Sequence, residues 1–201
     1  MLRIGLDFDN TIVCYDEVFH RVGVAAGLIP SSLPPNKLLV REHLRTAGRE
    51  SAWTALQGEV YGPRMTEAAP FPGVLPVLRR LQECGIDAWI VSHRTRHPFL
   101  GPPHDLHEAA REWISRTLVE RGHPLVAPGQ IFFELTRTAK LARIAACDCA
   151  LFLDDLPEIL LAPEFPDRTE RLLFDPERHH AATGLPRISS WAELPDRLER
   201  Q

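Results

Sequence analysis

The stretch that decides the fold is LRIGLDFDNTIV, residues 2–13. Its first half is apolar enough for a buried β-strand, and that strand runs directly into two aspartates, Asp7 and Asp9. Like charges this close are costly unless something neutralises them. A bound divalent cation would supply the missing positive charge, so the segment predicts a strand that ends at a metal site.

The composition is that of a globular protein. The chain has 201 residues, 44% hydrophobic and 25% charged, which is enough for one domain with a modest insertion. A net charge of −4 gives no general attraction to nucleic acid or anionic membranes. We expect no leader peptide, because the N-terminus enters a strand pattern at once. The sequence has no apolar run near the roughly 20 residues of a membrane helix and no zinc-ligand spacing among the four cysteines. We therefore expect a cytoplasmic protein with reduced thiols.

Hydrophobic periodicity predicts strands that alternate with helices after an early helical block. The strands are almost wholly apolar, which favours a parallel sheet covered by helices on both faces. We expect an α/β fold with a Rossmann-like three-layer core at 1–13 and 71–201, and a small helical insertion at 14–70. The expected strands cover 2–8, 86–92, 131–135, 149–155 and 171–175, and the expected helices cover 15–27, 36–47, 50–61, 73–85, 105–121, 138–147 and 190–199.

Polar side chains follow several of these strands, where ligands bind in parallel sheets. Ser92 ends the second strand, and Asp154 and Asp155 end a later one. Carboxylates gathered at one point form a hard, oxygen-rich site suited to Mg²⁺. Lys140 opens the preceding helix and is one of only two lysines among 23 basic residues, which favours a functional role for its compact ammonium group.

Taken in order, these segments resemble the motifs of the haloacid dehalogenase (HAD) superfamily. DFDNT at 7–11 is similar to the DxDxT signature, and WIVSHRT at 89–95 is similar to the second motif, an apolar strand that ends in Ser or Thr. Lys140 resembles the lone basic residue of the third motif, and LFLDDLPE at 151–158 resembles the acidic fourth motif. The helical block at 14–70 occupies the position of a C1-type cap in this family.

The resemblance implies a role for each matched residue. Asp7 would be the nucleophile and Asp9 the general acid/base. An acid at Asp9 favours phosphate ester hydrolysis over dehalogenation, because an alkoxide leaving group needs a proton and a halide does not. The implied phosphate-binding residues are Thr11, Ser92, His93 and Lys140, and the implied metal ligands are Asp7, Asp9 through its backbone carbonyl, Asp154 and Asp155. Which of Asp154 and Asp155 touches the metal directly stays open.

Candidate substrate contacts lie beside these motifs. Tyr15 and His20 follow the first motif closely, and Arg94 follows the second. Arg45 belongs to a stripe of arginines at four-residue spacing, which fits a solvated helix face or a site for a second anionic group.

The sequence therefore predicts a Mg²⁺-dependent phosphatase that forms an aspartyl-phosphate on Asp7 and acts on a small soluble metabolite, with a sugar phosphate favoured. The alternatives are a nucleotidase of the same mechanism and a catalytically idle protein that binds a metabolite or partner. An aromatic slot would favour the nucleotidase. We expect a monomer or homodimer that contacts neither nucleic acid nor membrane.

Overall fold

The computed structural model describes residues 2–198, and its internal contacts divide the chain into two compact units. Unit 1 comprises Met1–Val13, Pro70–Arg94 and Leu118–Gln201, and unit 2 comprises Cys14–Ala69 and Thr95–Thr117. Residue 1 and residues 199–201, which the predicted core includes, lie outside the described residues.

The division differs from the predicted boundaries at residues 95–117, which group with unit 2 rather than with the core. The reason is the packing of helix α5 (Leu106–Thr117) on the short 3₁₀ helix η1 (Met65–Glu67) and on helix α3. The buried indole of Trp113, on α5, donates a hydrogen bond from Nε1 to the carbonyl oxygen of Ala68 at 2.8 Å. Sequence periodicity identifies α5 as a helix but does not show which neighbours it packs against.

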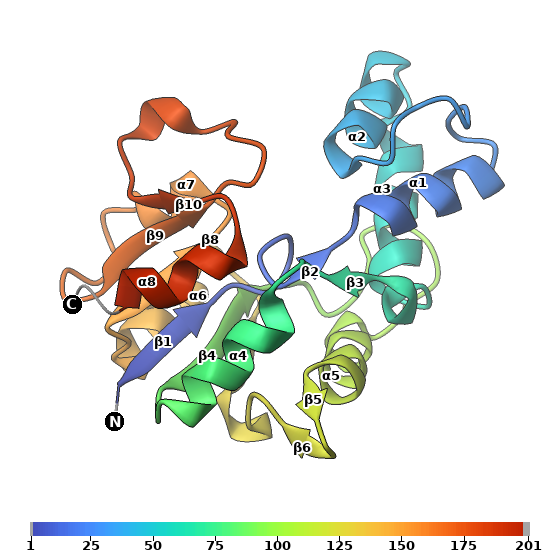
Figure 1. The fold of residues 1–201 in the computed structure, drawn as a ribbon. Helices are drawn as coiled ribbons and strands as arrows, with labels where there is room; N and C mark the ends of the chain where they lie inside the picture. Colours follow the sequence, from blue (N-terminus) through green and yellow to red (C-terminus); the bar gives the residue numbers. More distant parts are fainter. Residues whose placement is uncertain (1, 199–201) are drawn as a thin grey trace. The chain divides into compact units, whose positions relative to one another are not determined.

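Unit 1 is built on a six-stranded parallel sheet in the order β10-β9-β8-β1-β4-β7 (Figure 1). Helices α4 and α8 lie on one face of this sheet and α6 lies on the other. This arrangement confirms the predicted three-layer α/β core. The strands are β1 (Arg3–Leu6), β4 (Asp87–His93), β7 (Ile131–Glu134), β8 (Leu151–Asp154), β9 (Glu170–Phe174) and β10 (Arg187–Ile188). The helices are α4 (Val74–Glu83), α6 (Arg137–Cys147), α7 (Pro157–Leu160) and α8 (Leu194–Leu198), with 3₁₀ turns η2 (Pro128–Gln130), η3 (Ala181–Thr183) and η4 (Trp191–Glu193).

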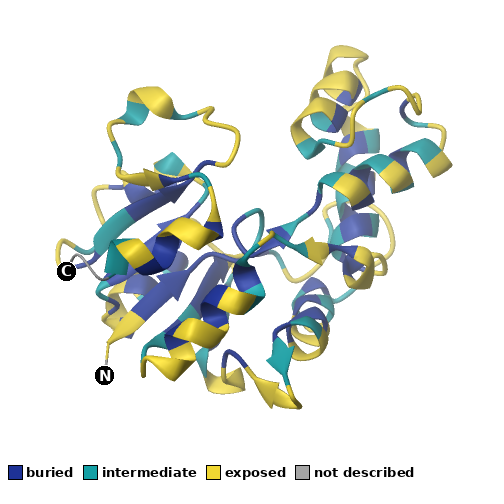
Figure 2. Cartoon of the chain, viewed as in Figure 1, coloured by how far each residue is buried: buried dark blue, intermediate teal, exposed yellow. Residues whose placement is uncertain are grey.

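The core of unit 1 forms because each element hides one apolar face. In α4, Val74, Val77, Leu78 and Leu81 recur at helical spacing and are buried. The sheet strands are buried along most of their length, and the helices are exposed on their outer sides (Figure 2). Gly5 in β1 leaves room for the ring of Phe152 on β8, because a Cβ at position 5 would lie 2.3 Å from Phe152 Cδ2.

Unit 2 is helical and has an aromatic core. Its elements are α1 (Asp16–Ala25), α2 (Lys37–Thr46), α3 (Glu50–Tyr61), η1 and α5. Phe19 stacks on Trp53 with ring centroids 4.9 Å apart, and both side chains are buried. Lys37 Nζ lies 5.5 to 5.7 Å from the ring centroids of Tyr15, Phe19 and Tyr61, a cation–π arrangement that ties the start of α2 to this core.

The remaining strands are short. β2 (Val13–Cys14) pairs with β3 (Ala69–Pro70), and β5 (Val119–Glu120) pairs with β6 (His123–Pro124). None of the helices within residues 2–198 is long and apolar enough to cross a membrane.

Candidate functional site

The register of the central strands brings two of the predicted aspartates together. Leu6 of β1 pairs with Leu153 of β8, and the next residues along these parallel strands are Asp7 and Asp154. The pairing continues one residue further, since the Asp7 backbone N–H donates to the Leu153 carbonyl at 2.8 Å. Both carboxylates therefore lie at the carboxyl edge of the sheet, and both are buried.

Lys140 joins these two carboxylates. It lies in the first turn of α6, and the Thr136 hydroxyl caps that helix by accepting a hydrogen bond from the Ala139 backbone N–H. The Lys140 ammonium donates to Asp7 Oδ1 and to Asp154 Oδ2, both at 2.6 Å. Its side chain is 2% exposed, so these contacts are made in a nearly dry environment. One ammonium group is thus hydrogen-bonded to two buried carboxyl groups.

Burial shifts the pKa values of Asp7, Asp154 and Lys140. Removal from water raises the pKa of Asp7 to about 7, with Lys140 opposing the shift and Asp154 adding to it. Burial likewise raises the pKa of Asp154, again against the attraction of Lys140. Burial alone would lower the pKa of Lys140, but Asp154 and Asp7 together hold it above its ordinary value. Lys140 is therefore a permanent cation at neutral pH.

The site has a set of oxygen donors that fits a divalent cation. Asp7, Asp154 and Asp155 each offer a carboxylate oxygen, and these oxygens lie within 4.8 Å of one another. Carboxylate oxygens are the donors that Mg²⁺ prefers, and an ion here would relieve the repulsion that Lys140 only partly offsets. Asp154 is further fixed by the Leu156 backbone N–H, which donates to its Oδ1 at 3.0 Å. The residues present therefore fit the predicted cofactor.

The loop after β1 holds the remaining first-motif residues. The backbone N–H groups of Ile12 and Val13 both donate to the Phe8 carbonyl, and Asn10 has a φ of +60°, so the chain turns tightly beyond Asp9. Thr11 is fully buried. Its hydroxyl donates to Asp155 Oδ1 at 3.5 Å, and its carbonyl accepts a hydrogen bond from Trp191 Nε1 at 2.9 Å. The sequence gives no signal for this support by Trp191, which lies 180 positions away.

The second motif contributes three consecutive residues with different surroundings. Ser92 is buried at the end of β4, and His93 is exposed. Arg94 is buried, and its Nη1 donates to Asp9 Oδ1 at 2.6 Å. Sequence reasoning selects Arg94 as a candidate substrate contact but does not predict this ion pair.

The three candidate contacts in unit 2 are placed differently from one another. Tyr15 is buried in the aromatic core, and its hydroxyl contacts Met65 Sδ at 3.4 Å. Arg45 is exposed and makes a two-bond salt bridge with Glu50, at 2.7 and 2.8 Å, which is consistent with the solvated-face interpretation. His20 has a buried Nε2 with no hydrogen-bond partner among the described residues.

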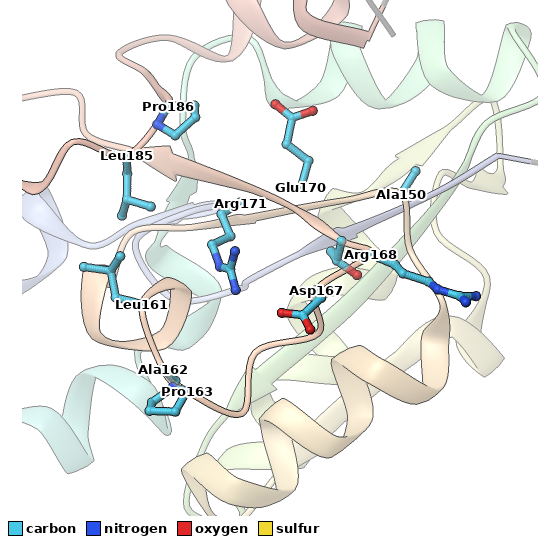
Figure 3. A pocket seen from close by; sticks show the side chains of 11 residues that line it. Ala150, Leu161, Ala162, Pro163, Asp167, Arg168, Glu170, Arg171, Leu185 and Pro186 are labelled. Carbon is cyan, nitrogen blue, oxygen red and sulfur yellow. The ribbon is translucent and has the colours of Figure 1, made fainter.

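A pocket of about 930 Å³ lies elsewhere on unit 1 (Figure 3). Ala150, Glu170 and Pro186, which line it, lie at or just before the starts of β8, β9 and β10. It therefore opens at the amino edge of the sheet, opposite the carboxyl edge that carries Asp154. None of the candidate site residues lines it.

Comparison with known proteins supports the fold. The chain is similar to solved structures of a HAD-superfamily hydrolase from Ehrlichia chaffeensis (TM-score 0.57, 13% identity, covering 98% of this chain and 96% of that one) and a conserved haloacid dehalogenase-like protein of unknown function from Agrobacterium tumefaciens (TM-score 0.60, 13% identity, 98% and 97% covered). The chain has the haloacid dehalogenase fold. The HAD fold also occurs in a phosphoserine phosphohydrolase-like protein from Francisella tularensis, which matches with a TM-score of 0.55 at 14% identity over 98% of this chain and 100% of that one.

One curated relative matches over the full length of both chains. It is a Bacillus cereus protein named "Putative nucleotidase", 24% identical over 213 residues. No model of a protein family matches the sequence. The predicted resemblance to the HAD superfamily is thus confirmed at the level of the HAD fold.

Proposed function

We propose that this protein is a Mg²⁺-dependent phosphomonoester hydrolase that forms an aspartyl-phosphate on Asp7. The observation that carries the proposal is the buried pairing of Asp7 with Lys140 and Asp154 at the carboxyl edge of the sheet. A structural ion pair would need one carboxylate for one lysine. A second buried carboxylate, with Asp155 beside it, is costly unless a further cation shares the site, and that cation can in turn bind an anionic phosphoryl group.

The reaction follows from the proposed roles. A carboxylate oxygen of Asp7 attacks phosphorus, the bond from phosphorus to the leaving oxygen breaks, and Asp9 gives that oxygen its proton. In the second step a water attacks phosphorus, Asp9 takes a proton from the water, and the bond between Asp7 and phosphorus breaks to release phosphate. Lys140, Ser92 and Thr11 hold phosphoryl oxygens as charge redistributes over them.

The metal has a supporting part in this proposal. Mg²⁺ held by Asp7, Asp154 and Asp155, with the backbone carbonyl of Asp9, would neutralise these carboxylates and orient a phosphoryl oxygen. We propose that His93, exposed at the end of β4, adds a further contact to the phosphoryl group.

We propose that unit 2 acts as the cap that excludes water during transfer, with His20 and Arg45 as candidate contacts to a small phosphorylated metabolite. Tyr15 is buried in the aromatic core of unit 2 and would act only through that core. His20 is the sharper of the two candidate contacts, because its Nε2 has no hydrogen-bond partner among the described residues and would gain one from a substrate hydroxyl. Replacement of His20 by Ala is expected to raise KM by about 10-fold with little change in kcat, because it removes one such bond. An unchanged KM would remove His20 from the proposed contacts.

The substrate class has two candidates. The sequence favours a sugar phosphate, and the name of the Bacillus cereus relative favours a nucleotide. The aromatic slot expected of a nucleotidase does not come from Tyr15, Phe19 or Trp53, because these rings are buried in the core of unit 2. Tyr61 is half buried and packs edge-to-face against Tyr15 and Phe19. Phe71 belongs to unit 1 and packs against Phe174.

The test is a panel of sugar phosphates and nucleoside monophosphates, together with p-nitrophenyl phosphate, assayed by phosphate release with Mg²⁺ or with EDTA. We expect turnover with Mg²⁺, little with EDTA, and a loss of at least about 10³-fold in Asp7→Asn, because that variant lacks the nucleophile. Rapid quenching of the wild-type enzyme with labelled substrate should trap phosphate on Asp7. Turnover that persists in Asp7→Asn contradicts the proposal, and no turnover on any substrate favours the metabolite-binding alternative.

A further inference from the structure

The Arg94 side chain is the second buried cation at the carboxyl edge of the sheet. It is 3% exposed, and its Nη1 lies 2.6 Å from Asp9 Oδ1. We infer that Arg94 is a positioning residue, which holds the Asp9 carboxyl group in the orientation needed to pass a proton to and from the reacting oxygens. This inference rests on the proposed function, because it assigns a task to Arg94 within that reaction.

Arg94 is held both at its backbone and at its guanidinium group. Its backbone N–H donates to the Glu134 carbonyl at 2.9 Å, which extends the pairing of β4 with β7 by one residue beyond His93. Its guanidinium carbon lies 5.8 Å from the ring centroid of Phe8, the residue between the two first-motif aspartates. Phe8 is itself fixed by an edge-to-face contact with Phe133. The backbone and the guanidinium of Arg94 are therefore both fixed, and the guanidinium contacts Asp9 in a defined position.

The contact acts on the side chain of Asp9, whereas the tight loop beyond it fixes the backbone. A guanidinium is planar and has donors in fixed directions, so a bond to Oδ1 restricts rotation of the whole carboxyl group. Proton transfer requires the carboxyl oxygen and the reacting oxygen to stay within hydrogen-bond distance and aligned. Loss of this restraint should slow proton transfer even though Asp9 remains present.

Arg94 positions Asp9 without taking part in the proton transfer itself. In the first step Asp9 gives its proton to the leaving oxygen. Arg94 keeps all its protons throughout. In the second step the proton from water returns to Asp9, so the pair ends as it began and no other reactant is needed.

The role differs from a substrate contact in a measurable way. A residue that grips the substrate in both the ground state and the transition state raises KM when it is removed. Removal of a residue that positions the acid lowers kcat, and the decrease is largest when the leaving oxygen needs a proton. The acidity of the leaving group therefore separates the two roles.

The experiment measures kcat and KM for two esters in wild type, Arg94→Met, Arg94→Lys and Asp9→Asn. p-Nitrophenyl phosphate has a leaving group that departs with little protonation, and glycerol 2-phosphate, or the best alkyl phosphate from the panel, has one that needs a proton. Arg143→Met is the matched control, because Arg143 makes a 2.7 Å pair with Glu134 in the same unit without touching Asp9.

We expect Asp9→Asn to lower kcat for the alkyl ester by about 10²- to 10⁴-fold and for the aryl ester far less. Arg94→Met should also lower kcat more for the alkyl ester than for the aryl ester, but by smaller factors. We expect a loss of about 10- to 100-fold on the alkyl ester and of less than about 3-fold on the aryl ester. Arg94→Lys should fall between Met and wild type, and Arg143→Met should stay near wild type for both.

Equal losses on the two esters in Arg94→Met, or a rise in KM with unchanged kcat, overturn the inference. If Arg94→Met does not fold, Arg94→Lys decides, and an absence of leaving-group bias in that variant overturns it as well. Failure of the proposed function has a different signature, since Asp7→Asn would then keep its activity, or Asp9→Asn would show no bias.

Discussion

The charge balance of the buried cluster makes a quantitative prediction about Lys140→Met. Methionine keeps much of the volume of the lysine stem but removes its charge. The two carboxylates that share the ammonium, Asp7 and Asp154, are 5% and 0% exposed, and both would lose their neutralising partner. Removal of one member of a buried ion pair typically costs about 3–5 kcal/mol, because the remaining charge is left uncompensated.

The expected result is a loss of about 3–5 kcal/mol in the free energy of unfolding at pH 8 with EDTA. For a chain of this length, 1 kcal/mol corresponds to about 2–4 °C in Tm, so the melting temperature should fall by about 6–20 °C. The loss should shrink at pH 5, because the buried acids can then take up protons. Urea unfolding followed by circular dichroism gives the free energy, and calorimetry gives Tm.

Two variants make the test specific. Asp7→Asn leaves Lys140 paired with Asp154, so it should be no less stable than wild type, and the double variant with Lys140→Met should recover part of the loss. Arg143→Met removes a half-exposed ion pair and should cost less than about 1 kcal/mol. The reasoning is refuted if Lys140→Met costs no more than Arg143→Met, or if Asp7→Asn is as destabilising as Lys140→Met.

Three further predictions follow from single features. Because burial raises the pKa of Asp7 from 3.8 to about 7, its contribution favours the folded state below pH 4 and is lost as the pH rises through 7. The stability of Asp7→Asn relative to wild type should therefore increase between pH 5 and pH 8 in EDTA, and a flat difference would contradict the burial of its charge. Mg²⁺ at about 100 times its Kd should stabilise the wild type by about 2.7 kcal/mol in thermal unfolding, whereas Asp154→Asn should show a much smaller effect. Gly5→Ala should cost about 1–3 kcal/mol because its Cβ would meet the ring of Phe152, while Gly129→Ala, with open space at Cβ, should cost little in urea unfolding.

The sheet could be predicted from the sequence because its strands are short apolar runs that end at polar residues. The carboxyl edge follows from that pattern, and the structure brings Asp7, Asp154 and Lys140 into direct contact there. The last strand was missed. β10 is only Arg187–Ile188, too short for a periodicity, and it forms because β9 offers a free edge for pairing. The predicted helix at 190–199 is split into η4 and α8 within the described residues.

Contacts between segments that are distant along the chain could not be predicted from the sequence. The pairing of Arg94 with Asp9 spans 85 positions and depends on the direction of one side chain across Phe8. The grouping of 95–117 with unit 2 depends on α5 packing against η1. Both features depend on which surfaces meet, and hydrophobic periodicity reports only which surfaces are apolar.

The two first-motif aspartates, only two residues apart, have different electrostatic surroundings. Asp7 shares its cation with Asp154, which leaves the cluster short of positive charge and suited to a metal ion. Asp9 pairs with Arg94, a second buried cation, which directly follows β4. In the proposed reaction, the shared lysine leaves Asp7 as a nucleophile that still needs a cation, and Arg94 orients Asp9 as the acid. The different roles that we propose for these two carboxylates thus match the different cations that they contact.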